Sequence, residues 1–97
     1  MQFTITVKNN ATQVLAQKLF LYIEGQKTTV AVKKLAIGES EDIVFEIQPS
    51  DRKIMLSYLN TESAIIIKAI GDINNISHRN LVIQDVTLQG TVKYSFT

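Results

Sequence analysis

Among single side chains, His78 is the first candidate for catalytic chemistry, because it is the one histidine and cysteine is absent. A catalytic triad needs a histidine held between a nucleophile and a carboxylate. The neighbouring Ser77 points to the opposite face from His78 if this segment is extended. A single histidine without thiolates also provides too few ligands for a zinc site. The sequence therefore predicts a solvated loop histidine, no catalytic residue and a protein that is not an enzyme.

Asp72, Asn74 and Asn75 place oxygen donors at nearly alternate positions, which is how a calcium-binding loop begins. The last position of such a loop carries a bidentate acidic side chain, but Ile83 stands there in this chain. The segment is thus predicted to be a polar turn that binds neither a metal nor a cofactor. Two Asn-rich turns remain as candidate contact sites for a partner, and their residues are Asn9, Asn10, Asp72, Asn74, Asn75 and His78.

Composition restricts the classes of partner. The 97 residues include ten basic and nine acidic side chains, a net charge of +1, so we expect no partner among nucleic acids or anionic membranes. Apolar runs such as residues 64–67 are far too short to span a bilayer. The length predicts a single domain over residues 1–97. Because residues 1–10 lack the features of a signal peptide, we expect either a complete cytoplasmic chain or a domain of a longer protein that is extracellular or at the cell surface.

These polar turns must be positioned by β-strands, because apolar and polar residues alternate with a period of two along most of the chain. Gly25 and Gln26 separate two such runs by the two residues of a tight hairpin. Gly38 separates two more, a pattern typical of strands joined at the edge of a sheet. The expected strands cover residues 2–8, 16–23, 28–35, 43–48, 53–58, 64–70, 81–88 and 92–96.

Two segments depart from simple alternation. Residues 64–70, AIIIKAI, are apolar on both faces and predict the central strand of a sheet. After Ile83 the apolar positions slip by one residue, so that Val86 lies on the opposite parity, which predicts a β-bulge or a crossing between sheets. Other apolar side chains fall opposite the expected core positions of their strands, and these are Met55, Leu59, Ile66 and Ile70. If these faces are left uncovered, they form an apolar patch of the kind that marks a protein contact.

Seven or eight short antiparallel strands separated by Gly and Asn turns predict an all-β fold, a β-sandwich of two sheets. A small β-barrel is the alternative.

Three stretches resemble the bacterial and archaeal immunoglobulin-like adhesion modules called CARDB, and the related NEW3-type domains. They are ITVKNNATQVLAQKLFLYIEGQK (residues 5–27), LAIGESEDIVFEI (residues 35–47) and GDINNISHRN (residues 71–80). The terminal hairpin VTLQGTVKYSFT departs from the family pattern. The resemblance implies an immunoglobulin-like β-sandwich that serves as a binding, spacing or adhesion module of a larger envelope or secreted protein, with no catalytic residues.

The leading hypothesis is therefore a non-catalytic module that binds a protein or glycan partner. The alternative is a structural subunit that assembles with itself into a homo-oligomer, as in a pilus, a sheath or a phage appendage. Strands that are apolar on both faces motivate this alternative, because such faces have to be covered.

Overall fold

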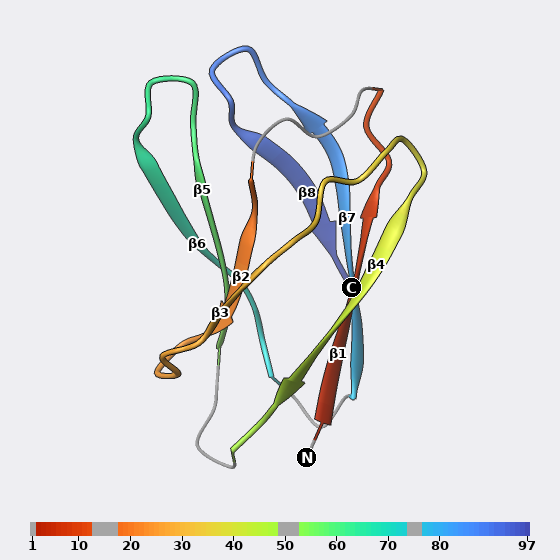
Figure 1. Ribbon diagram of the computed structural model, residues 1–97, viewed down its shortest axis with the longest axis vertical. Helices are drawn as coiled ribbons and strands as arrows, with labels where there is room; N and C mark the ends of the chain where they lie inside the picture. The colour runs from red at the N-terminus through yellow and green to blue at the C-terminus, as the bar shows by residue number, and fades with distance from the viewer. Residues whose placement is uncertain (1, 13–17, 49–52, 74–76) are drawn as a thin grey trace.

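The computed structural model describes residues 2–12, 18–48, 53–73 and 77–97. Among these residues eight strands form two four-stranded sheets that face each other across a shared core, and no helix is present (Figure 1). The first sheet has the order β4 (Ser40–Glu46), β1 (Gln2–Asn9), β7 (His78–Val86), β8 (Val92–Phe96). The second has the order β3 (Thr29–Ala31), β2 (Phe20–Ile23), β5 (Lys53–Leu59), β6 (Ile65–Asp72). The predicted all-β sandwich is confirmed, and two separate sheets take the place of the alternative barrel.

One strand pair differs from the antiparallel pairing that the sequence predicted. β1 pairs antiparallel with β4 but parallel with β7. A parallel pair needs a long connection between its strands, and here the whole second sheet lies between β1 and β7 in the chain. The resulting strand order differs from the ABED and CFG sheets of constant-type immunoglobulin domains.

The segment around Gly38 connects the two sheets. β3 and β4 are edge strands, as the pattern indicated, but they belong to different sheets. β3 ends at Ala31, earlier than predicted. The segment that then crosses to the other sheet places Val32 and Leu35 in the core, where they are 6% and 0% exposed. The hairpin at Gly25 is confirmed by the β2–β3 pairing, although residues 24–28 form its link. β2 begins at Phe20, later than predicted, and residues 16–17, the first two of the expected strand, lie outside the described residues.

The core is built from the inner side of each strand. Phe3, Ile5 and Val7 of β1 are fully buried, and so are Ile54 and Leu56 of β5. These are the positions that the period of two assigned to the core. Each such side chain contributes about 1.5–3 kcal/mol of burial free energy, so the two inner faces together provide the driving force that holds the sheets face to face.

β6 is an edge strand, and its predicted place in the centre of a sheet is wrong. Ile66 and Ile70 pack partly buried against the core, whereas Ile65 and Ile67 are 68% and 57% exposed. Apolar residues on both faces are typical of a strand that is covered on both sides. An edge strand with one apolar face exposed to solvent has the same sequence pattern. The periodicity of apolar residues does not distinguish such a strand from a covered one.

The predicted slip after Ile83 is a β-bulge. The β7–β8 register shifts between Ile83 and Asp85, and β7 remains in one sheet. β7 is also the partner of the terminal hairpin strand. The β5–β6 pair has a second irregularity, which the sequence did not indicate. Met55 lies opposite Ala69, but the preceding residue Ile54 lies opposite Gly71, so that the register shifts by one residue on β6.

Contacts at both ends of β6 and β8 connect the two sheets. At one end the turns after β5 and β7 meet (Figure 1), where the Thr61 amide and hydroxyl donate to the Gln89 carbonyl at 3.0 and 2.7 Å. At the other end the Arg79 guanidinium lies 4.3 Å from the Phe96 ring centroid and donates to the Asp72 carbonyl at 3.1 Å. These contacts hold the edge strands β6 and β8 of the two sheets at a fixed separation.

Between these ends, the buried Tyr58 hydroxyl accepts a hydrogen bond from the Val92 amide at 3.1 Å. We expect Tyr58→Phe to lower the free energy of unfolding by about 1–3 kcal/mol, because the Val92 amide loses its acceptor inside the protein. Urea denaturation measures this difference. The matched control is Tyr22→Phe on the half-buried outer face of β2, for which a change within about 0.5 kcal/mol is expected; equal effects of the two variants would contradict the assignment.

Candidate functional site

His78 belongs to a hydrogen-bonded chain across three neighbouring strands on the outer face of the first sheet. It is the first residue of β7 rather than a loop residue, and it is exposed. The Thr6 hydroxyl of β1 donates to Asp42 Oδ1 of β4 at 2.6 Å and lies 2.7 Å from His78 Nε2. Since the hydroxyl proton is directed at the carboxylate, the Thr6 oxygen can accept a hydrogen bond from the imidazole.

The order of these three groups does not fit nucleophilic catalysis. In a triad the imidazole lies between the hydroxyl and the carboxylate and removes the hydroxyl proton. Here the Thr6 hydroxyl lies between His78 and Asp42. The chain therefore links β7, β1 and β4 on a solvated surface, and the arrangement provides no activated nucleophile.

Thr6 and Asp42 were not among the candidate residues from the sequence. Only the register brings them to His78: Thr6 lies opposite Asp42 in the β1–β4 pair, and Thr4 lies opposite His78 in the β1–β7 pair. A parallel pairing between strands this far apart in the chain leaves no local signal in the sequence.

The structure separates the residues of the two Asn-rich turns. Thr4 pairs with His78 and Asn9 pairs with Ile83, so that Asn9 and His78 lie near opposite ends of the β1–β7 pair. Five residues of strand correspond to about 17 Å. Asp72 is exposed at the end of β6, and its carbonyl accepts from Arg79, the residue after His78. Asn74 and Asn75 lie outside the described residues. Within the described ranges no three His, Cys, Asp or Glu side chains gather in a way that could hold a metal ion.

Asn9 has a structural role instead of a contact role. It is 0% exposed, which excludes it from direct contact with a partner. Its Nδ2 donates to the Leu35 carbonyl at 3.1 Å, and its Oδ1 accepts from the Ala11 amide at 3.0 Å. Its backbone carbonyl accepts from the Gly38 amide at 2.7 Å. Asn9 thus fixes the segment that crosses between the sheets, whereas the neighbouring Asn10 side chain is exposed.

The outer face of the second sheet is apolar over three strands. In the register, Phe20 of β2 lies opposite Ser57, which lies opposite Ile67 of β6. Residues that are directly opposite in paired strands share a face, so these side chains and their neighbours form one surface. We call it the apolar face, and its members are Phe20, Tyr22, Met55, Leu59, Ile65 and Ile67. It contains Met55 and Leu59, as the sequence predicted, but Ile65 and Ile67 take the places expected for Ile66 and Ile70.

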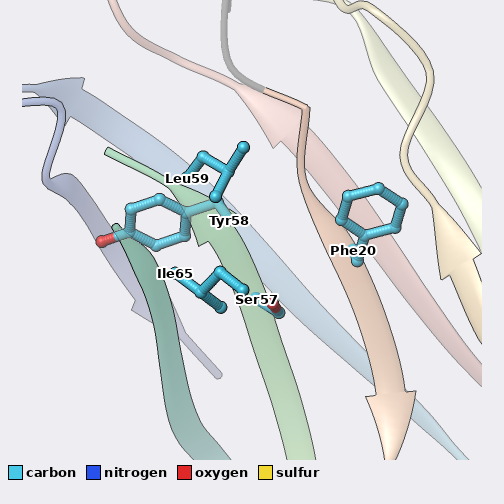
Figure 2. Close-up of a pocket in the computed structure, with 5 residues that line it drawn as sticks. All are labelled: Phe20, Ser57, Tyr58, Leu59 and Ile65. Carbon is cyan, nitrogen blue, oxygen red and sulfur yellow. The ribbon is translucent and has the colours of Figure 1, made fainter. Parts of the chain in front are cut away.

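The apolar face is hollowed between β2 and β6. Figure 2 shows Leu59 and Ile65 next to each other, with Phe20 across from them and Ser57 between. Together with Tyr58 these residues line a shallow pocket of about 210 Å³. Pockets for drug-sized ligands measure about 300–1,000 Å³, so the hollow suits a single side chain of a partner better than a whole small molecule.

Comparisons with known proteins inform the fold. No protein-family model and no curated protein matches the chain. A solved structure described as "Trapped Toxin" is similar to 99% of this chain, with a TM-score of 0.52 and 14% sequence identity. This chain spans 23% of the length of that chain. The likeness supports the sandwich fold and carries no statement about activity. In the described residues, no helix has the length and apolar character needed to cross a membrane.

Asn9→Ala is expected to lower the free energy of unfolding by roughly 2–4 kcal/mol, because a buried carbonyl and a buried amide both lose their partner. Asn10→Ala provides an adjacent control with the same chemical change at an exposed position, where we expect less than about 0.5 kcal/mol. Chemical denaturation of both variants makes the comparison. A stable Asn9→Ala protein would show that the crossing segment does not depend on this side chain.

Proposed function

We propose that the chain is a non-catalytic binding module and that the apolar face is its contact surface. The observation that carries the proposal is the exposure of large aliphatic side chains side by side on one sheet: Leu59 51%, Ile65 68% and Ile67 57%. Soluble monomers rarely expose contiguous apolar surface unless it serves a contact. The outer face of the first sheet is different, because there Thr6, Asp42 and His78 are hydrogen-bonded to one another.

The chemistry of the apolar face favours a protein partner over a glycan. Saccharide recognition needs polar groups placed to hydrogen-bond hydroxyls, but the polar side-chain atoms on this face are limited to the hydroxyls of Tyr22 and Ser57 and the thioether of Met55. Lys18, whose Nζ lies 5.7 Å from the Phe20 ring centroid, adds a positive charge next to the aromatic ring. An apolar centre with a polar rim is the usual composition of a protein interface.

A role within a longer protein is part of the proposal. The resemblance to CARDB and NEW3-type modules implies a binding, spacing or adhesion unit of an envelope or secreted protein. In the "Trapped Toxin" structure a sandwich of this fold corresponds to 23% of a longer chain. Both features support a module that presents one face to a partner while other parts of a polypeptide hold it in place.

A structural subunit that assembles with itself is the second candidate. It is favoured by one specific observation, the exposed apolar edge strand β6. Edge strands with these properties add strands from other chains.

Ile65→Lys/Ile67→Lys is expected to weaken partner binding, because two charges would have to be buried in an apolar contact. Immobilised wild-type and variant proteins can be screened against cell extracts and glycan arrays. Each captured protein is then purified, and its affinity is measured by calorimetry. We expect a loss of affinity of roughly tenfold or more.

The control is Val44→Lys, which places a lysine at a 55% exposed valine on an edge strand of the other sheet. A partner that is lost equally with Val44→Lys would contradict the assignment of the contact surface. Capture of glycans alone would contradict the choice of a protein partner.

A further inference from the structure

β6 is the least protected of the four edge strands. β3 has only 3 residues, and β8 has 5 residues with Lys93 exposed. β4 has 7 residues and carries the charges of Glu41, Asp42 and Glu46. Short length and charged side chains are the usual protection of a sheet edge. β6 has 8 residues, and Ile65 to Ile67 carry no charge.

The backbone groups at the free side of β6 can be identified from the ladder. The Asn60 amide donates to the Ala64 carbonyl at 3.0 Å, which makes these two residues a hydrogen-bonded pair. In an antiparallel ladder such pairs alternate with pairs that exchange no hydrogen bond. Ala64 and Ile66 therefore bond to β5, whereas Ile65 and Ile67 direct their N–H and C=O groups away from it. No described strand lies on that side of β6.

Ile65 and Ile67 thus combine free backbone groups with exposed side chains on the apolar face. We infer that a second copy of this chain binds here, by adding its own β6 antiparallel to β6 about a two-fold axis. The inference rests on the proposed contact surface and names its occupant. A second copy offers the same unpaired backbone groups and the same exposed isoleucines, so the contact is self-complementary.

Charge and side-chain size select the register. A two-fold axis through Lys68 would place two lysines directly opposite each other, which is destabilising. An axis through Ile66 instead places Ile65 opposite Ile67 of the second copy, and the two exposed isoleucines of β6 then meet twice. Both residues of this pair have free N–H and C=O groups, so the pair exchanges backbone hydrogen bonds.

The limits of the regular part of β6 agree with this register. With the axis through Ile66, the stretch that pairs between the two copies runs from Ala64 to Lys68. It ends before the irregularity between Ala69 and Gly71 in the β5–β6 pair. Lys68 lies opposite Leu56 on the inward-facing parity and is nevertheless exposed. An inward-facing charge and a bulge both limit how far strand pairing extends along an edge. The two-fold contact uses the β6 edge of both copies, so it closes as a dimer and leaves no β6 edge for an open fibre.

Size-exclusion chromatography with light scattering, from micromolar to millimolar concentration, tests the dimer. We expect the mass to rise from 10.9 kDa to about twice that value. Ile67→Pro removes an N–H that faces the free edge, so the variant should fold and remain monomeric. Ile67→Lys should also prevent dimerisation, and Val44→Lys should dimerise as the wild type does. A wild-type monomer at every concentration, or a dimer that persists in both Ile67 variants, would overturn the inference.

Single cysteines test the register, because the natural chain contains none. With the axis through Ile66, Ile66→Cys brings two cysteines to a directly opposite pair within disulfide range, whereas Ile67→Cys places them on a diagonal about 7–8 Å apart. Oxidation at equal concentration should therefore crosslink Ile66→Cys severalfold faster. Faster crosslinking of Ile67→Cys would overturn this register.

The two proposals fail separately. A strictly monomeric wild-type protein that still binds another protein through Ile65 and Ile67 would refute the dimer and leave the contact surface intact. A dimer that forms through β6, with no other partner found, would identify the second copy as the occupant.

Discussion

Every sheet in this protein has one face that must be removed from water, and the two inner faces cover each other. The fully buried residues of β1 and β5, among them Ile5 and Leu56, meet in this shared core. Side chains alternate between the two faces of a strand, so the residues between the buried ones must form the outer faces. The chemistry of the two outer surfaces, polar on the first sheet and apolar on the second, is thus a consequence of how the core is assembled.

The polar groups inside and between the sheets serve this packing. Asn9 is fully buried and bonds to the crossing segment, and the Tyr58 hydroxyl bonds to the opposite sheet. Gly71 lies so close to the Phe96 ring that an added Cβ would be 2.5 Å from Phe96 Cε2. The outer side of the second sheet carries mostly aliphatic and aromatic side chains instead.

Much of the fold was predictable from the sequence, because it follows from local alternation. The core positions of β1, β4 and β5 and the bulge after Ile83 were all predicted from the pattern of apolar residues. The sheet to which a strand belongs depends on distant pairing, so the edge position of β6 and the parallel β1–β7 pair were not predictable. The same dependence on distant pairing applies to the candidate site. The sequence identified His78, but the contacts of Thr6 with His78 and Asp42 depend on the register of three strands that are far apart in the chain. Asn9 was assigned to a contact surface because an asparagine in a turn gives no sign that it is buried.

The central position of β1 in its sheet has a consequence for the order of events during folding. Its residues pair with β4 on one side, and Thr4 pairs with His78 on the other. During synthesis β1 therefore lacks one neighbour until the chain has been made as far as β7. Pairings between residues so distant in sequence are slow to form, on the order of milliseconds to seconds. During that interval the AIIIKAI segment is exposed with β-prone, apolar residues. Lys68 is the one charged residue of this segment, and a charge inside such a segment opposes the aggregation of incompletely folded chains.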